Sequence, residues 1–327
     1  MGWIVSHQSA LEYWRRESIT DTLAWKKLRA TKPHALPRDT KELQINEFWG
    51  LAIPLHVLVG SDNARKTTRN LHCHISIGTF PSGSFVMTQS GMIVSSPELC
   101  FLQMAGEVPF IDLIKLGYEF CGSYRMDERS ASKKVSFGVM PLTNIKKLSA
   151  YLDKATRMYG RMDAMRALRF ILEGSASPME TILAMLLTLP YKLGGYGFPK
   201  PQLNYRVEVS DKVTSSKFKT TSRPAFYCDL YWPDKKIAVE YDSDEYHLGA
   251  LRIEKDAIRR NALESAGVRM VTVSRRQLTD APKMREISEA LSRLLDKRLV
   301  FKEKEFTSLN AGLVRQLLPE DSIDKYL

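Results

Sequence analysis

Residues 226–242 read FYCDLYWPDKKIAVEYD and place two strand-like segments on either side of a turn. The central Pro-Asp pair is favourable turn chemistry, because proline fixes φ at the first central position of a turn. We expect a tight turn that pairs Trp232 with Lys235 and so sets Asp229 opposite Ala238. The stretch therefore predicts an antiparallel hairpin with a defined register.

This hairpin gathers acidic side chains on one face. Side chains alternate along a strand, so Ala238, Glu240 and Asp242 share a face with Asp229, which lies diagonal to Glu240 within ~7–8 Å. The opposite face predicts a core of Cys228, Leu230, Ile237 and Val239. Carboxylates this close repel one another unless a cation lies between them, and oxygen ligands suit Mg²⁺ or Mn²⁺. The hairpin predicts a metal site with Asp229, Glu240 and Asp242 as ligands, and an exposed acidic hairpin without metal is the alternative.

The segments around the hairpin predict the element order αβββαβ. They are a helix that begins at Ser177-Pro178-Met179-Glu180, strands at 205–209, 225–232 and 236–242, a helix over 248–266, and a strand at 269–274. Gly267 is typical of the end of a helix. We therefore expect an α/β protein with this order in its C-terminal half and a smaller α+β domain before it.

The N-terminal half predicts a small sheet followed by helices. The expected elements are a helix within residues 1–30, strands at 55–59, 72–77, 85–88 and 92–94, a capping box and helix start at Ser95-Ser96-Pro97-Glu98, and helices within 142–172. The boundaries we expect are 1–140 for a recognition or partner-binding domain, 141–174 for a basic helical connector, 175–300 for the acidic hairpin's domain, and 301–327 for a tail.

Composition favours a polyanionic partner. The formal net charge is +11, and nucleic acid is the commonest partner of a chain this basic. Four cysteines lie far apart without a C-x-x-C pair, which argues against a disulfide framework and a cysteine-rich zinc module. The alternation His72-Cys73-His74 is typical of a strand, and we expect no zinc site there. No secretory signal and no run of ~18 apolar residues is present, so we expect a cytoplasmic protein without membrane contact.

A family resemblance rests on the same acids. Asp229, ten intervening residues, Glu240-Tyr241-Asp242 and then His247 resemble the PD-(D/E)XK nuclease superfamily, in particular its very-short-patch-repair-like branch. Ser177-Pro178-Met179-Glu180 is similar to that branch's opening helix, and Arg252, Asp256, Arg259 and Leu263 before Gly267 are similar to its R-D-x-x-R-x-x-x-L helix. The resemblance covers about residues 175–280. Asp242 stands where the superfamily has Lys, and Ser243 stands where the branch has Gly.

The resemblance implies a restriction-endonuclease-like core and a Mg²⁺- or Mn²⁺-dependent endonuclease that hydrolyses DNA phosphodiester bonds. Asp229 and Glu240 would bind the metal, and Asp242 would be a third ligand or orient water. His247 would act as a general acid or base or contact phosphate, with a plain surface histidine as the alternative. Glu180 could reach the site, but a capping box already explains a Glu there, and we expect the cap.

Basic residues near these acids have two interpretations each. Arg252, Asp256 and Arg259 follow helical spacing, which predicts a ladder of ion pairs, although an Arg on that face could contact the scissile phosphate. A hydroxyl-rich loop could clamp the nucleic-acid backbone or be a plain surface loop. Its basic residues are Lys212, Lys217, Lys219 and Arg223.

The N-terminal half is similar, in short motifs at 1–16, 54–59 and 95–98, to the C-terminal part of AbiEi-type antitoxin regulators. That resemblance implies recognition of nucleic acid or of a protein partner, in a phage-defence, toxin–antitoxin or mobile-element system. Two rivals to an autonomous endonuclease stay open. One is a non-catalytic DNA-binding regulator that keeps the nuclease fold, and the other is a nuclease subunit active only within a larger complex.

Overall fold

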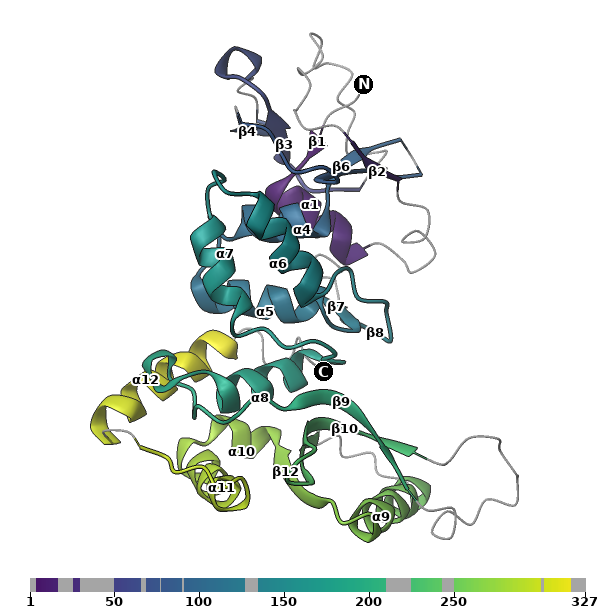
Figure 1. Ribbon diagram of the computed structural model, residues 1–327, viewed down its shortest axis with the longest axis vertical. Coiled ribbons are helices and arrows are strands. Elements are labelled where there is room, and N and C mark those ends of the chain that lie inside the picture. The colour runs from purple at the N-terminus through teal and green to yellow at the C-terminus, as the bar shows by residue number, and fades with distance from the viewer. Residues whose placement is uncertain are drawn as a thin grey trace. The chain divides into compact units, whose positions relative to one another are not determined.

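The computed structural model describes residues 4–16, 26–29, 50–65, 69–76, 78–89, 91–126, 135–209, 225–242, 250–300 and 303–318. The chain forms two compact units, Met1–Ile171 (unit 1) and Leu172–Leu327 (unit 2) (Figure 1). Both units combine helices with β-sheet, so the predicted α/β class is confirmed. Among the described helices, none has the length and apolar character that crossing a bilayer requires.

Unit 1 contains a six-stranded mixed sheet with the order β2-β5-β6-β1-β3-β4. Its strands are β1 (Ile4–Val5), β2 (Lys26–Leu28), β3 (Leu55–Val59), β4 (Leu71–Ile75), β5 (Phe85–Met87) and β6 (Ile93–Ser95). The last four match the strands predicted for this half. Strands β3 and β4 run parallel, which aligns His56 with His72 and Leu58 with His74. A two-stranded ladder joins β7 (Tyr124–Met126) to β8 (Val135–Phe137).

The helix expected within residues 1–30 is present at its start but does not include Lys26–Leu28. Helix α1 covers His7–Arg16, whereas Lys26–Leu28 forms strand β2, in which Leu28 pairs with Phe85 of β5. Tertiary pairing here overrides the helical pattern of the sequence. The two exposed lysines of β2 lie on the first strand of the sheet order, and charge on an edge strand discourages pairing with other chains.

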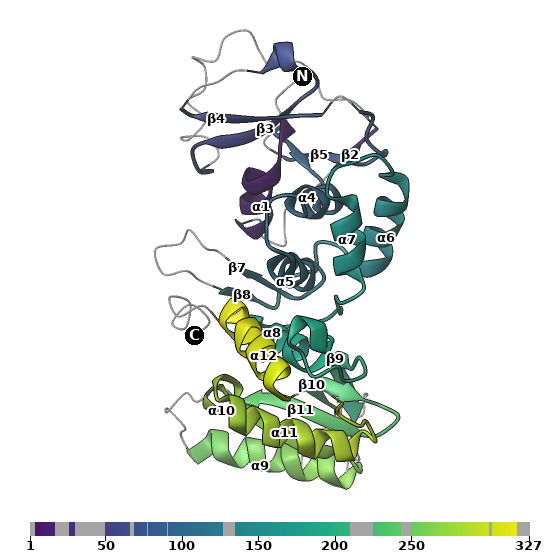
Figure 2. The same cartoon turned by 90° about the vertical axis from the view of Figure 1, so that its left-hand side faces the viewer.

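The remaining elements of unit 1 are mostly helical. They are η1 (Asp62–Ala64), α4 (Pro97–Met104), α5 (Phe110–Phe120), α6 (Ile145–Lys154) and α7 (Arg161–Leu168). Helix α1 contacts β3 and α4, while α6 and α7 pack against α4 and each other (Figure 2). The stretch 141–174, expected as a connector, thus supplies two helices to the packing of unit 1.

Helix α4 begins as predicted but without a capping box. Ser96 Oγ accepts from the Leu99 N–H at 3.2 Å, and Pro97 occupies the first helical turn. In a capping box the side chain of the third helical residue bonds back to the cap residue, whereas Glu98 is the second helical residue of α4. Its buried carboxylate instead accepts from the Thr143 hydroxyl at 2.8 Å. Glu98 therefore ties α4 to the loop before α6, and the predicted capping box is wrong.

Unit 2 contains a four-stranded sheet with the order β12-β11-β10-β9. Its strands are β9 (Gln202–Glu208), β10 (Ala225–Trp232), β11 (Ile237–Asp242) and β12 (Arg269–Ser274). Strands β9, β10 and β11 are antiparallel neighbours, and β12 runs parallel to β11. A parallel neighbour needs a crossover connection, and helix α9 lies in it.

The helices of unit 2 complete the predicted order. They are α8 (Pro178–Thr188), η2 (Tyr191–Leu193), α9 (Ala250–Ser265), α10 (Arg275–Thr279), α11 (Ala281–Leu294) and α12 (Glu303–Leu317). The succession α8-β9-β10-β11-α9-β12 is the αβββαβ order expected from the sequence. Gly267 has φ +81°, as expected of a glycine that ends a helix. Helix α12, in the stretch expected as a tail, packs against α8 and η2.

Two helices cover the hairpin β10–β11. Helix α8 contacts both strands (Figure 2). Helix α9 shares with the sheet a hydrophobic cluster that includes Tyr231, Ala238 and Leu263. Cys228 also belongs to this cluster, so its predicted place with Leu230 on the opposite face is wrong. Strict alternation is interrupted between Cys228 and Tyr231, because the pairing of β9 with β10 skips one residue on each strand.

Candidate functional site

The register of the β10–β11 hairpin differs from the predicted one. Tyr231 pairs with Ala238 and Leu230 pairs with Val239, where the paired residues end. Asp229 and Glu240 are the next residues along the two strands, and the negative charge of Glu240 acts on Asp229. The predicted register, with Asp229 opposite Ala238, is therefore wrong.

The turn explains the change of register. It spans residues 233–236, with the Lys235 N–H bonded to Trp232 O and the Lys236 N–H bonded to Pro233 O, each at 3.2 Å. Lys236 adopts φ +51°, a left-handed conformation that a lysine seldom takes and that the sequence does not signal. The longer turn shifts the pairing by two residues in total, which preserves the face on which each side chain lies.

Asp229 lies in the middle of β10, where a backbone donor of β11 orients its carboxylate. The Tyr241 N–H donates to Asp229 Oδ2 at 2.9 Å. Tyr241 follows Glu240 on β11, so the two facing strands are joined here by a side-chain bond. This bond fixes one carboxylate oxygen of Asp229 beside the Glu240 position.

Glu180 reaches this region from the start of α8. Ser177 Oγ accepts from the Glu180 N–H at 3.1 Å, so the predicted serine cap is confirmed. The reciprocal bond differs, because Glu180 Oε2 accepts from the Ala176 N–H at 2.9 Å and from Asn204 Nδ2 at 2.7 Å. Asn204 Nδ2 also donates to Gly174 O at 2.9 Å. The carboxylate is therefore fixed by the loop before α8 and by β9, with the Ser177 side chain as a further partner.

The electrostatics of Asp229 and Glu180 show that the two carboxylates are close. Burial, followed by the negative charge of Glu180, raises the pKa of Asp229 to about 7, and Glu240 adds to the effect. Burial also raises the pKa of Glu180, although its bonds from Ala176 and Asn204 oppose the rise. Two partly buried acids that are costly to ionise together are typical of a site that a cation completes.

Glu240 is held by an arginine of α9. Arg259 donates through both terminal nitrogens to the two oxygens of the Glu240 carboxylate, and its Nη2 also donates to Tyr227 O at 2.6 Å. The Glu240 side chain is only 14% exposed. The predicted ladder of ion pairs along the helix is thus replaced, at Arg259, by a bidentate ion pair with Glu240 of β11. This pair supplies positive charge beside the acids.

Of the other predicted site residues, the structure describes Asp242 but leaves several outside the described ranges. Asp242 ends β11 and is exposed, with Ser274 of β12 as its neighbour across the ladder. Within the described ranges, the acids of unit 2 do not form a set of three ligand atoms all within 4.8 Å of one another. The remaining predictions lie outside the described residues: His247, Lys212, Lys217, Lys219, Arg223, and the side chains of Arg252 and Asp256.

Asn204 is a functional residue that the sequence did not reveal. It interrupts β9 with φ +46°, and its amide holds the Glu180 carboxylate. An asparagine within a strand is a weak signal of special geometry, because asparagine is depleted in strands and tolerates left-handed φ. Its partner on α8 is distant in sequence, which is why pattern alone does not find it.

Replacing Glu180 with Gln separates the structural and electrostatic roles of this residue. The bonds from Ala176 and Asn204 both go to Oε2, and a glutamine carbonyl can accept both, so we expect little loss of stability. The charge beside Asp229 is removed, and we expect Mn²⁺ affinity to fall by about 10–100-fold, the usual cost of disturbing a group around a metal site. Calorimetric titration of the full chain measures the affinity, with the exposed Glu264→Gln as control. Unchanged affinity would leave Glu180 with a helix-start role only.

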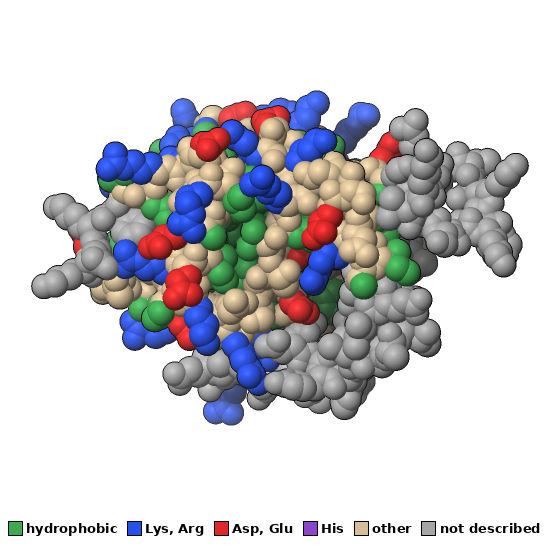
Figure 3. Space-filling model, turned by 90° about the horizontal axis from the view of Figure 1, so that it is seen from below, with side chains coloured by type: hydrophobic (Ala, Val, Ile, Leu, Met, Phe, Trp, Pro, Cys, Tyr) green, Lys and Arg blue, Asp and Glu red, His purple; other side chains and the backbone are tan. Residues whose placement is uncertain are grey.

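Charge on one face of unit 2 is mixed. Figure 3 shows Lys and Arg side chains interspersed with Asp and Glu around a strip of apolar side chains. Among the side chains coloured by type, this face has no patch of a single sign. The basic charge expected to contact nucleic acid is therefore not concentrated on the part of this face that the structure describes.

No protein-family model matches the sequence, and no curated protein or solved structure has significant similarity to it.

Proposed function

We propose that unit 2 is a Mg²⁺- or Mn²⁺-dependent endonuclease that hydrolyses phosphodiester bonds of DNA. The observation that carries the proposal is the electrostatic proximity of Glu180, at the start of α8, to Asp229 on β10, which Glu240 on β11 also influences, within the element order αβββαβ. The raised pKa of Asp229 supports a cation site, since a bound cation would offset the cost of ionising neighbouring carboxylates.

The donor atoms are of the kind that a hard divalent cation binds, and they would have to move closer together on binding, because no three of the described acids of unit 2 have ligand atoms within 4.8 Å of one another. Asp229 and Glu240 offer carboxylate oxygens from facing strands, and Asp242 offers a third from the end of β11. Oxygen ligands of this kind are those that Mg²⁺ and Mn²⁺ prefer. Such an ion, when bound, polarises the phosphodiester, lowers the pKa of a bound water and stabilises the leaving oxygen.

The chain's own residues would prepare the site for that chemistry. The Tyr241 N–H holds Asp229 in one orientation, and the bonds from Ala176 and Asn204 hold Glu180. Arg259 neutralises Glu240 while keeping a guanidinium beside the acids, where it can also contact a phosphate oxygen. DNA is the proposed polyanion because of the chain's net charge of +11 and the family resemblance of the hairpin.

One observation favours the rival of a non-catalytic DNA-binding regulator. Arg259 engages both oxygens of Glu240, so this carboxylate is already compensated without a metal. A protein that only binds nucleic acid could keep such a pair for stability. Asp229 and Glu180 argue for catalysis, because the ion pair does not involve their carboxylates and burial makes their charges costly.

Incubation of the purified full chain with supercoiled plasmid tests the proposal. We expect conversion to nicked or linear DNA with Mg²⁺ or Mn²⁺ and none with EDTA, because the carboxylates alone do not supply the positive charge that the reaction needs. Gel electrophoresis over time measures the conversion, and a single-stranded RNA in a parallel reaction tests substrate class. Plasmid binding without metal-dependent cleavage would favour the regulator, and equal cleavage with EDTA would contradict the metal mechanism.

A further inference from the structure

Unit 1 carries a histidine cluster that the proposed nuclease does not use. It consists of His7, His56, His72 and His74, which are all the histidines within the described ranges. The rings of His7 and His74 stack with centroids 3.4 Å apart, and His72 stacks on His74 at 4.7 Å. His56 lies 4.8 Å from His72 and 5.0 Å from His74. Segments far apart in sequence therefore meet at one group of imidazoles.

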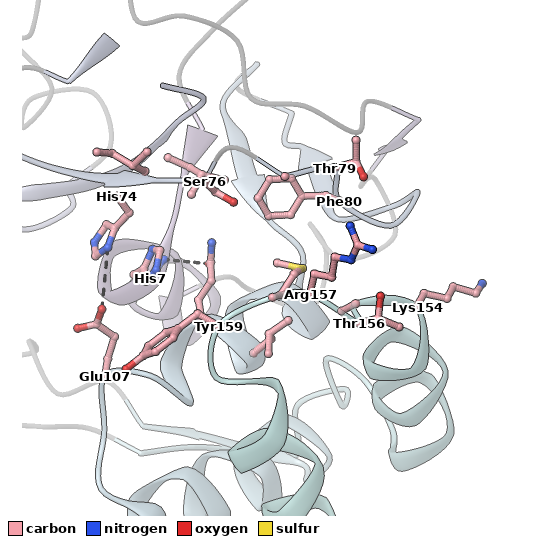
Figure 4. Close-up of a pocket in the computed structure, with 17 residues that line it drawn as sticks. His7, His74, Ser76, Thr79, Phe80, Glu107, Lys154, Thr156, Arg157 and Tyr159 are labelled. Carbon is pink, nitrogen blue, oxygen red and sulfur yellow. Dashed lines mark hydrogen bonds and ion pairs between the residues drawn. The ribbon is translucent and has the colours of Figure 1, made fainter. Parts of the chain in front are cut away.

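The topology of the sheet explains this meeting. Alternation along β4 places His72 and His74 on the same face, and the parallel register with β3 puts His56 beside His72. His7 is the first residue of α1 and has φ +48°. A histidine in left-handed conformation is uncommon, and such residues concentrate at functional sites. Glu107 follows α4 and faces the same cluster (Figure 4).

In the rings of His7 and His74, hydrogen bonds engage one nitrogen and leave the other available as a metal ligand. His7 Nδ1 bonds with Ser6 Oγ at 3.0 Å, and His74 Nε2 bonds with His56 Nδ1 at 2.9 Å. His74 Nδ1 lies 3.9 Å from Glu107 Oε1. Metal-ligating histidines nearly always use their second nitrogen in a bond of this kind, which fixes the ring. Both rings therefore have the outer partners expected of metal ligands.

One nitrogen from each of these two rings and the Glu107 carboxylate form a compact set. One ligand atom from each of His7, His74 and Glu107 lies within 4.8 Å of the others, and the described residues contain no second set of three like it. Burial, with the charge of neighbouring histidines as a smaller cause, lowers the pKa of His7 to about 2 and that of His74 to about 3. Neutral imidazole is the form that binds metals.

A pocket of about 680 Å³ opens beside this set. His7, His74, Glu107 and Tyr159 line it (Figure 4). Gln103 is a further lining residue. Gln103 Oε1 accepts from the His7 N–H at 3.1 Å, whereas its buried Nε2 has no hydrogen-bond partner within the described part of the chain. A buried amide donor left without a partner is costly, and it suggests a bound polar ligand or water in the pocket.

We propose that His7, His74 and Glu107 bind a divalent transition-metal ion, with Zn²⁺ as the best fit, and leave one coordination position open to the pocket. Two imidazoles and one carboxylate are the protein ligands of many zinc sites with an exchangeable fourth ligand. Binding requires the stacked rings of His7 and His74, whose planes differ by 10°, to tilt so that their in-plane lone pairs converge on the ion. Zn–N distances of ~2.0–2.1 Å put the ligand atoms of a tetrahedral site ~3.3 Å apart, so the 3.9 Å between His74 Nδ1 and Glu107 Oε1 closes by roughly 0.6 Å. The Glu107 side chain is 45% exposed and can make this movement.

This site is independent of the proposed nuclease, because all its ligands lie in unit 1. The experiment uses the full chain with Asp229→Asn and Glu240→Gln, stripped of metal with EDTA, so that the hairpin acids do not compete. Titration with Co²⁺, followed by visible absorption, should show one equivalent bound, and Zn²⁺ should displace it. Calorimetry gives the affinity for Zn²⁺.

Three variants test the ligand assignment. Glu107→Gln alters an exposed side chain, so the fold should persist, and His7→Asn uses a residue that tolerates left-handed φ. Each should weaken Zn²⁺ binding by more than about 100-fold. Loss of a residue that only hydrogen-bonds to a metal ligand costs up to about that much, and loss of a ligand itself should cost more. The matched control His72→Asn removes a stacked, exposed ring outside the set and should leave affinity nearly unchanged.

Three results would overturn the proposal. They are no stoichiometric Co²⁺ or Zn²⁺ binding by the parent, unchanged affinity in Glu107→Gln, or an equal loss in His72→Asn. The last would indicate binding by the stack as a whole rather than by the named set. Because no readout here is DNA cleavage, failure of this site and failure of the nuclease are distinguishable.

Discussion

Asp229→Asn is expected to abolish metal-dependent DNA cleavage by the full chain. Asparagine keeps the size of the side chain and an oxygen that can accept the Tyr241 N–H, but it removes the charge that a cation needs. A metal supplies several kcal/mol of transition-state stabilisation, and each ~1.4 kcal/mol is tenfold in rate. We therefore expect the rate to fall by at least about 100-fold.

The measurement is the initial rate of plasmid cleavage at saturating Mg²⁺, with thermal unfolding followed on the same sample. Asp234→Asn is the matched control, since this exposed acid lies in the turn of the same hairpin. It should cleave at the parental rate. Cleavage by Asp229→Asn at the parental rate would remove Asp229 from the site, whatever the behaviour of the control.

The stability of the metal-free protein is expected to fall as pH rises from about 4 to about 7. Burial raises the folded-state pKa of Asp229 to about 7, above the value near 3.9 of an unfolded chain. Between these values the folded state binds more protons than the unfolded state, so unfolding becomes easier with increasing pH. A shift of this size corresponds to a few kcal/mol, and Glu180 acts in the same direction.

A divalent cation should reverse this loss, because it binds the ionised carboxylates that the folded state otherwise disfavours. We expect Mn²⁺ to raise the unfolding temperature strongly at pH 8 and little at pH 5. Thermal denaturation at both pH values, each with EDTA or with Mn²⁺, gives the unfolding temperature under these four conditions. Asp229→Asn should show a flatter pH dependence and a smaller response to Mn²⁺ at pH 8. A parental protein whose stability rises between pH 5 and pH 8 without metal would contradict the assignment.

The sequence was sufficient for the αβββαβ elements of unit 2, although not for α12, and it did not give their exact pairing. Periodicity and the Ser177 and Gly267 helix boundaries predicted the order αβββαβ correctly, because each is a local signal. The hairpin register was wrong because the turn is longer than the Pro-Asp pair suggests, and Lys236 takes a conformation that residue type does not favour. A shift of two residues does not by itself change the face of a side chain, so hydrophobic alternation could not detect the shift.

The candidate site was predicted in part for a related reason. Alternation put Asp229 and Glu240 on one face, but Arg259 lies on a helix beyond them, and helical spacing pointed to partners along its own helix. The structure pairs it with Glu240 instead. Asn204 was missed because its contact with Glu180 joins elements that no local pattern connects.

The histidine cluster had the weakest sequence signal. Alternation identified His72-Cys73-His74 as strand, and β4 confirms this. The partners of these rings come from β3 and from the start of α1. Parallel pairing between strands and the packing of a distant helix start are set by tertiary structure, so spacing along the chain does not reveal the cluster.

Position 204 has an unusually narrow choice of amino acid. The backbone there has φ +46°, and the side chain must donate to both Glu180 and the Gly174 carbonyl. Glycine and aspartate accept the backbone geometry but carry no amide donor, whereas glutamine has the donor but rarely adopts left-handed φ. Asparagine meets both demands. Sequence drift at this position is therefore more constrained than at the exposed positions of β9, although nothing about the strand's own pattern marks it.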